Sequence, residues 1–420
     1  MRVAVVGAGI TGLALTHYLT EEGVDSVTYE ASDHPGGVIR SETIDGRTVE
    51  IGPQRLRLTP GVRELVDAVG LSGAVVEAGS EHLFVYSRGR LRKAPMDKGS
   101  FLRTDLLSWP AKLRLLAEPL TRQGMGEETA AELFTRKFGR QAYERFIGPL
   151  YGGIYGSDPA EMPAKFALEG LLTREAETGS LLRAFLQRVG QGQQSPPITF
   201  AGGNQRLPRA IAEAHADRIE FDTPVTDISA TSGAKYVVET ETGAETFDAV
   251  VLTTPAWVTA ALLDDVASGT EHLAQLTYNP LAMVHVDADC DRDGFGYQVA
   301  FDESLHMLGA SWNDSMFDRE NLYTLFFGGM HEPEILDRSD EELATLATGE
   351  FEQIMGEPAT VLNVTTNERW FPAYDRSWYG LETFETPDGV HLATNYTDRM
   401  GIPSRIREAK ELAETLSRSD

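Results

Sequence analysis

The sequence predicts an α/β protein with three parts: a doubly wound, Rossmann-like domain that binds a dinucleotide, a sheet-based substrate domain and an inserted helical domain. Three observations predict this class. A strand, a glycine-rich turn and a helix open the chain, periodic leucines follow between residues 59 and 194, and strand patterns return after residue 195. With 420 residues, of which 41% are hydrophobic, the chain is long enough for two or three domains.

The opening motif supplies the parts of a dinucleotide-binding turn. A short apolar strand at residues 3–6 leads into Gly-Ala-Gly-Ile-Thr-Gly at residues 7–12 and then into an amphipathic helix. Gly7 permits a tight turn, Gly9 lets the backbone approach a pyrophosphate, and Gly12 lets the helix pack on the sheet. The amides and the dipole at the start of this helix would then receive the phosphate charge.

Glu30 follows a second strand signal at residues 24–29, 18 residues after Gly12. A carboxylate at this place accepts hydrogen bonds from both hydroxyls of a ribose and disfavours a 2′-phosphate. We interpret the next pair, Gly36-Gly37, as a second close approach of the backbone to a long, extended cofactor, which NAD enzymes do not need there. A plain loop is the alternative. The sequence therefore predicts that the doubly wound domain binds FAD.

Five segments are expected along the chain. They are residues 1–58 (first part of the FAD-binding domain), 59–194 (mainly helical insertion and substrate region), 195–255 (second part of the FAD-binding domain), 256–385 (substrate domain) and 386–420 (closing FAD-binding segment). Periodic leucines mark the helical region. The stretch 190–197, rich in Gly, Gln, Ser and Pro, is the expected linker at its end.

Strand patterns after this linker fall into two groups. We expect the last strands of the nucleotide-binding domain at residues 219–225, 236–240 and 247–252, and a second sheet from residues 281–286, 306–308 and 322–327. A closing helix is expected at residues 404–416, and Pro403 suits its first turn. The positive end of this helix would meet the pyrimidine edge of the flavin.

The charge of the chain bears on partners and on the host. The sequence carries 64 acidic and 37 basic residues, a net charge of −27 spread along its length, so nucleic acid is not an expected partner. Only seven of the basic residues are lysines. Molar salt shortens the Debye length to about 3 Å and screens such self-repulsion. We therefore expect a salt-accumulating host, such as a haloarchaeon, with an ordinary acidic bacterial enzyme as the alternative.

Other kinds of site are not indicated. The single Cys290 allows neither an intramolecular disulfide nor a cysteine zinc cluster, and the nine histidines show no ligand spacing, so no metal is expected. A Gly-x-Ser-x-Gly turn of the hydrolase kind does not occur. The sequence shows neither an uncharged apolar run of about 18 residues nor a signal-peptide pattern, which predicts a cytoplasmic protein.

With these elements in order, the chain resembles the protoporphyrinogen and coproporphyrinogen oxidases of the FAD-dependent amine oxidase superfamily, nearly from end to end. Four segments carry the resemblance: residues 7–12 with Glu30, Gly36-Gly37 and residues 50–53; residues 149–159; Phe200 with Gly202, Gly203 and Leu207; and Trp370-x-Pro372-x-Tyr374 with residues 395–406. The first segment indicates FAD, whereas the second and fourth are more particular to porphyrinogen oxidases. The closing segment departs from the family pattern, because Thr394 and Arg399 stand where glycines are usual and Glu408-Ala409 replaces Ser-Gly.

The resemblance implies where FAD would lie. The phosphates would meet Gly7, Gly9, Thr11 and Gly12, the ribose Glu30, the adenine Val225, and the flavin end Gly36, Gly37, Gly52, Pro53, Trp370, Met400, Gly401 and Ile402. Ala8, Ala31 and Val38 complete this expected cofactor-binding set.

The resemblance also implies a reaction. Members of the family oxidise a porphyrinogen, protoporphyrinogen IX or coproporphyrinogen III, to the porphyrin in haem biosynthesis, by hydride transfers to flavin N5, and an acceptor such as oxygen or a quinone then takes the electrons. No catalytic side chain is assigned, because the flavin carries the chemistry. Phe326 and Phe327 would help line an apolar slot for the tetrapyrrole, and Lys98 would pair with a propionate. Core packing of the two rings and a solvated lysine are the alternatives.

Several alternatives stay open from the sequence. A flavin oxidase of the same superfamily that acts on an amine or an isoprenoid is one, and a non-redox FAD-binding protein is another. The stretch 101–120, with Trp109 and several leucines, would suit contact with a membrane surface or a redox partner, although the same stripe could pack the helical domain. The sequence does not predict an oligomeric state.

Overall fold

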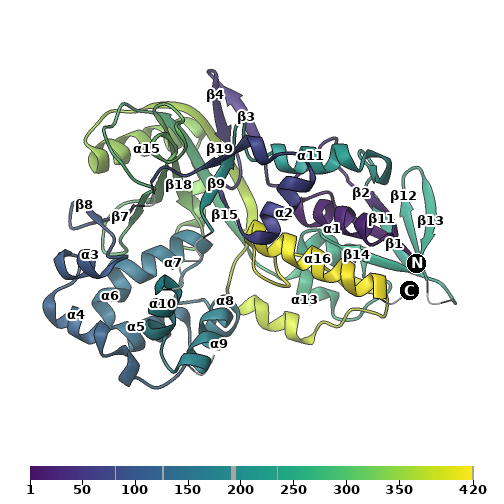
Figure 1. The fold of residues 1–420 in the computed structure, drawn as a ribbon, viewed down its shortest axis with the longest axis horizontal. Helices are drawn as coiled ribbons and strands as arrows, with labels where there is room; N and C mark the ends of the chain where they lie inside the picture. The colour runs from purple at the N-terminus through teal and green to yellow at the C-terminus, as the bar shows by residue number, and fades with distance from the viewer. Residues whose placement is uncertain (81, 125–126, 191–194, 234, 419–420) are drawn as a thin grey trace.

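A five-stranded parallel sheet forms the centre of the nucleotide-binding part of the computed structural model (Figure 1). The structure describes residues 1–418 apart from 81, 125–126, 191–194 and 234. The side chains of residues 98, 154 and 188–190 are not described. In spatial order the strands are β10 (Ile219–Glu220), β2 (Asp25–Tyr29), β1 (Arg2–Val6), β14 (Ala249–Leu252) and β20 (Val390–Leu392). All neighbouring strands run parallel. The carboxyl ends of strands that are far apart in the sequence therefore lie along one edge of this sheet.

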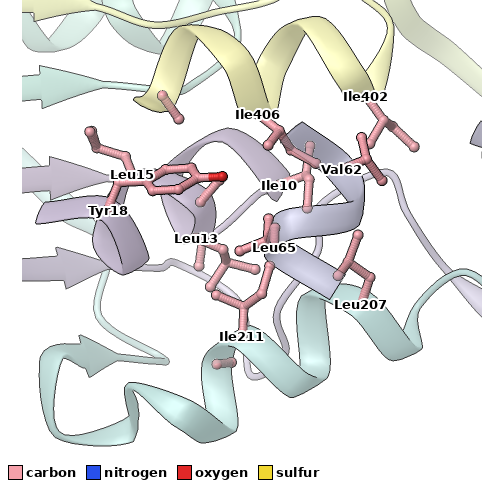
Figure 2. Packing of buried hydrophobic residues seen from close by; sticks show 14 of the residues in the cluster. Ile10, Leu13, Leu15, Tyr18, Val62, Leu65, Leu207, Ile211, Ile402 and Ile406 are labelled. Carbon is pink, nitrogen blue, oxygen red and sulfur yellow. The ribbon is translucent and has the colours of Figure 1, made fainter. Parts of the chain in front are cut away.

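The two faces of this sheet are covered by different elements. One face packs against α1 (Ile10–Glu21), α2 (Pro60–Ala68), α11 (Arg206–Ala214) and α16 (Ile402–Arg418). Figure 2 shows Ile10, Val62, Ile402 and Ile406 of these helices pointing toward one another. The other face packs against the antiparallel strands β11 (Val225–Ala230), β12 (Tyr236–Thr240) and β13 (Gly243–Phe247).

Strand β1 shows why both faces must be covered. Val3 and Val5 belong to the core under the helices, whereas Ala4 and Val6 belong to the core under the antiparallel strands. Successive side chains of a strand point to opposite faces, so an apolar run without alternation indicates burial on both sides. Residues 236–240, predicted as a strand of the nucleotide-binding domain, are β12 of the smaller sheet, because periodicity locates a strand without choosing its partner.

A seven-stranded sheet forms the second layer of the molecule, at the upper left of Figure 1. Its order is β19 (Thr360–Pro372), β15 (Tyr278–Asp287), β18 (Leu322–Gly328), β17 (Met307–Trp312), β16 (Gly296–Val299), β7 (Leu83–Ser87) and β8 (Arg90–Lys93). Helix α15 (Asp340–Met355) packs on one face through Leu343 and Phe351. Strands β7 and β8 come from the region predicted to be mainly helical, and they extend this sheet.

The helices at the lower left of Figure 1 come from one continuous stretch of chain. They are α3 (Lys98–Arg103), α4 (Trp109–Leu116), α5 (Ala130–Phe138), α6 (Arg140–Ala142), α7 (Gly148–Tyr155), α8 (Ala164–Ala167), α9 (Glu169–Thr178) and α10 (Leu181–Gly190). Of the expected linker 190–197, residues 191–194 lie outside the described residues. Beyond it, β9 (Pro197–Phe200) pairs with β5 (Leu56–Arg57) and β6 (Val75–Glu77) and so returns the chain to the nucleotide-binding part. None of the helices in the described part is long and apolar enough to cross a bilayer.

Candidate functional site

The turn between β1 and α1 is fixed by contacts within the protein. Gly7 has a φ of +102°, which favours glycine, and a Cβ at Gly12 would lie 1.9 Å from the carbonyl oxygen of Gly7. The hydroxyl oxygen of Thr253, at the end of β14, lies 2.9 Å from the carbonyl oxygen of Val6 and 3.0 Å from that of Gly7. Two glycines and a neighbouring strand therefore hold the turn in shape.

Packing within the described structure does not explain the glycine at position 9. Its φ of −67° and ψ of 176° suit any residue, and a Cβ there would meet nothing within 4 Å in the described structure. Gly9 is also the N-cap of α1, and among the described residues no side chain caps this helix. The first amides and the positive end of α1 thus face a place that a ligand can approach closely only because residue 9 has no side chain. The pyrophosphate of FAD fits this cradle, and Ala8, Thr11 and Gly12 border it.

Glu30 lies at the end of β2, beside the same turn. One carboxylate oxygen accepts a hydrogen bond from the Ala8 amide at 2.6 Å, and the other accepts from the Ser32 amide at 3.0 Å and the Ser32 hydroxyl at 2.8 Å. These contacts fix the carboxylate and use three of its roughly four acceptor positions, so about one position remains for a ribose hydroxyl, on the oxygen that accepts from Ala8. Ala31 is exposed next to it.

Val225 is brought close to this acid by backbone hydrogen bonds. The Glu30 amide donates to the Glu220 carbonyl at 2.9 Å, and the Thr223 amide donates to the Glu30 carbonyl at 2.8 Å. Val225 begins β11 two residues later. The residues expected at the ribose and the adenine therefore lie side by side, although they are far apart in the sequence.

The second pair of glycines lies against the first turn. The Gly36 amide donates to the Ala8 carbonyl at 2.8 Å, and φ is +114° at Gly36 and +57° at Gly37. A Cβ at Gly52 would lie 2.0 Å from the carbonyl oxygen of Val38. Gly36 and Gly37 thus pack on the phosphate turn, and Gly52 packs on Val38 just beyond them. These contacts connect residues expected along the phosphates with residues expected at the flavin end.

Residues 50–55 continue from this point across the seven-stranded sheet, on the face away from α15. Three hydrogen bonds join them to successive strands: His285 Nε2 of β15 to the Glu50 carbonyl at 3.0 Å, the Thr324 hydroxyl of β18 to Gln54 Oε1 at 2.9 Å, and Arg55 to Ser311 Oγ of β17 at 3.3 Å. Burial lowers the pKa of His285 to about 4, so the ring is neutral near pH 7 and its Nε2 carries the hydrogen.

The Glu50 carboxylate anchors this crossing segment. It is 1% exposed, it pairs with Arg319 at 2.7 Å, and it accepts a hydrogen bond from the Asn204 amide at 3.1 Å. Removing one partner of a buried ion pair costs about 3–5 kcal/mol. Arg319 was not among the predicted residues, and no sequence pattern near it points to Glu50.

The closing segment brings a second helix to the carboxyl edge of the parallel sheet. β20 runs parallel to β14, and α16 begins at Ile402 and packs beside α1 (Figure 1). The amides of Gly401 and Ile402 therefore lie at the positive end of a helix, as an electron-rich flavin edge would require. Met400 is half-buried in front of them.

A buried arginine accounts for one departure from the family pattern in this segment, Glu408; its contacts with residues 394 and 399 are to the backbone and do not explain Thr394 or Arg399. Arg405 is 3% exposed, and its guanidinium donates to the carbonyls of Thr394 and Arg399, at 2.8 Å in the second case, and pairs with Glu408. Glu408, in place of the usual serine, thus neutralises Arg405. The loop before α16 is held by this network, which the sequence analysis did not anticipate.

The expected substrate residues have different surroundings. Phe327 is fully buried in the core under α15, which favours a packing role. Phe326 points to the opposite face and is half-buried, in one row with Met283, Gly309 and Gln298 of the neighbouring strands. Lys98 begins α3, but its side chain lies outside the described part. Trp370 is half-buried in β19, beside a register shift against β15.

Comparisons with known proteins show the family of this chain. The family model described as flavin containing amine oxidoreductase matches residues 10–415. The chain belongs to this family. Protoporphyrinogen oxidase 2 of Arabidopsis thaliana is 27% identical over 90% of this chain and 85% of its own length. Coproporphyrinogen III oxidase of Staphylococcus aureus is 26% identical over 86% of each chain.

A solved structure supports the fold. The crystal structure from Exiguobacterium sp. 255-15, which carries the provisional name protoporphyrinogen oxidase, superposes with a TM-score of 0.82 at 24% identity and covers 100% of this chain and 99% of its own. The α/β, Rossmann-like class predicted from the sequence is thereby confirmed. As a flavin containing amine oxidoreductase, the chain is an FAD-dependent oxidoreductase.

Replacing Gly9 with alanine separates cofactor binding from folding in this oxidoreductase. A Cβ at Gly9 meets no described atom, so we expect the thermal midpoint of the FAD-free protein to stay unchanged. The same Cβ would lie where the pyrophosphate approaches, so FAD affinity should fall about tenfold or more, measured by fluorescence titration. Gly349→Ala, at another open position, is the matched control. Equal FAD affinity in G9A and G349A would contradict the placement of the pyrophosphate.

Proposed function

We propose that the chain oxidises a porphyrinogen, protoporphyrinogen IX or coproporphyrinogen III, to the porphyrin in haem biosynthesis. The observation that carries the proposal is the match to relatives named for both substrates, at 26–27% identity over 86–90% of the chain. The two relatives differ in the porphyrinogen that they are named for and share the reaction type. The likeness to both supports the reaction and leaves the choice of porphyrinogen to experiment.

The arrangement of the described residues suits this chemistry. FAD, when bound, accepts two electrons in each oxidation step as a hydride at N5. The positive end of α16 stabilises the negative charge that the pyrimidine edge then gains. The crossing segment 50–55, which contains the expected flavin-end residues Gly52 and Pro53, lies along one margin of the sheet face that carries Phe326 and Met283, and this supports the proposal. The apolar side chains of Phe326 and Met283 on this face suit a flat, carbon-rich ring system, as the reaction requires.

Helix α7 closes the other margin of the same sheet face. A Cβ at Gly153 would lie 1.9 Å from Gln298 Oε1, and a Cβ at Gly152 would lie 2.9 Å from the ring of Phe301. These two glycines, which lie in the segment 149–159 that carries the family resemblance, therefore permit α7 to pack directly on β16. We place the tetrapyrrole between α7 and the crossing segment, over Phe326.

The proposal is tested by anaerobic mixing of the yellow holoprotein with each freshly reduced porphyrinogen in molar potassium chloride. We expect the flavin absorbance to bleach with one of the two. Porphyrin fluorescence should grow through repeated turnovers after oxygen or a quinone is added as acceptor. Free FAD at the same concentration measures the uncatalysed reaction. A flavin that stays oxidised with both porphyrinogens would refute the function and direct the search to amines and isoprenoids.

We also propose that the helical part makes peripheral contact with a membrane. Trp109, Leu113 and Leu116 follow one face of α4 and are 64%, 65% and 51% exposed, and Leu120, in the 3₁₀ turn Glu118–Leu120 that follows, is 89% exposed. Four basic residues and two aspartates line a recess of about 540 Å³ beside α3: Arg90, Arg92, Lys93, Arg103, Asp97 and Asp105. An apolar stripe next to basic side chains is the arrangement by which peripheral proteins hold a lipid surface.

Replacing Leu113 and Leu120 together with glutamine should abolish this contact without unfolding the protein, because both side chains are exposed. Each leucine contributes about 1.5–3 kcal/mol on burial, so co-sedimentation with phosphatidylcholine and phosphatidylglycerol vesicles should fall more than tenfold. Tyr379→Gln, at an exposed aromatic residue of another element, is the control. Undiminished sedimentation of the double variant, or none with the wild type, would contradict the proposal.

A further inference from the structure

Arg55 emerges from the most firmly anchored part of the crossing segment. Its neighbour Gln54 is 6% exposed and donates hydrogen bonds to the carbonyls of Glu50 and Gly52 at 3.0 and 3.1 Å. Gln54 also accepts from the Thr324 hydroxyl at 2.9 Å. These hydrogen bonds fix the backbone just before Arg55 and attach it to the sheet, so they determine where the arginine side chain begins.

The guanidinium of Arg55 has few polar contacts. Its carbon lies 3.7 Å from the centre of the Phe295 ring, and the hydrogen bond to Ser311 Oγ at 3.3 Å is the one recorded among the described residues, although an arginine carries five N–H donors. Burial, and secondly repulsion from Arg57, lowers the pKa of Arg55 to about 9. The group therefore still carries its positive charge near pH 7.

Other buried arginines of this protein differ in one respect. Arg319 pairs with Glu50, Arg405 pairs with Glu408, and Arg92 pairs with Asp105 at 3.0 Å. Within the described residues no carboxylate pairs with Arg55, in a chain that holds 64 acidic residues against 37 basic ones. A half-buried cation that has lost part of its hydration and has no counter-ion in the protein favours the binding of an anion from outside.

The surroundings of Arg55 point to the substrate as that anion. Ser311 and Thr324 lie on the same sheet face as Phe326, one row nearer to the crossing segment. Gly309, which pairs with Phe326 in the next row, has no side chain. The planar fork of a guanidinium matches a carboxylate in two parallel hydrogen bonds. We propose that Arg55 binds a carboxylate of the substrate, a propionate of the porphyrinogen, and so sets its orientation over the flavin; this inference rests on the proposed function.

The test compares a porphyrin tetra-acid with its uncharged ester. Coproporphyrin III and its tetramethyl ester are titrated into the oxidised holoprotein, with binding followed by porphyrin absorbance, for wild type, Arg55→Met and Arg55→Lys. A hydrogen bond to a charged group corresponds to about 10- to 100-fold in affinity. We expect Arg55→Met to lose this much for the acid and nothing for the ester, and Arg55→Lys to lose less.

Two controls separate a binding role from a structural one. Arg57→Met removes a neighbouring exposed cation that donates to the Ser195 carbonyl and should leave both affinities unchanged. The FAD content and thermal midpoint of Arg55→Met should equal those of the wild type; if this variant does not fold, the acid-to-ester ratio of Arg55→Lys decides. An unchanged affinity for the acid, or an equal loss for acid and ester, would overturn the assignment. Failure of the wild type to bind either porphyrin would instead refute the porphyrinogen function, and the role of Arg55 with it.

Discussion

The shared carboxyl edge of the parallel sheet is the constraint on which the rest of the structure depends. Because β1, β14 and β20 run parallel, the helices that follow β1 and β20 both begin at this edge. Two helix N-termini from opposite ends of the chain thus lie side by side, over the core that holds Ile10 against Ile402 and Ile406. Positive helix ends attract negative charge, and an extended cofactor with a pyrophosphate at one point and an electron-accepting ring at another satisfies both.

The crossing segment 50–55 links the nucleotide-binding part to the seven-stranded sheet. Glu50 is buried with Arg319, and the backbone and side chains that follow bond to β15, β18 and β17 in turn. With FAD bound as proposed, the distance between cofactor and sheet would be set by hydrogen bonds along one short piece of chain. In the proposed function, this short segment would place the reactive ring over the sheet face that carries Phe326.

Local motifs could be predicted from the sequence, whereas long-range pairings could not. Gly7, Gly12 and Glu30 act within one strand-turn-helix-strand unit, and their spacing fixes their neighbours. Phe326 and Phe327 could not be told apart until the strand register showed that alternate residues face opposite sides. Glu118, Lys137 and Glu175 form a fully buried charge cluster, although an acidic composition suggests solvated charges; burial of this kind depends on tertiary contacts that no sequence period records.

The position of FAD in crystals of the holoprotein tests the central claim most directly. The account predicts the pyrophosphate at the first amides of α1, beside Gly9, and the pyrimidine edge of the flavin at the first amides of α16, beside Gly401. The dimethylbenzene end would then lie away from α16, and the reactive face would look toward Phe326. A flavin bound with its pyrimidine edge away from α16, or a pyrophosphate away from Gly9, would contradict the claim that the two helix ends share one cofactor.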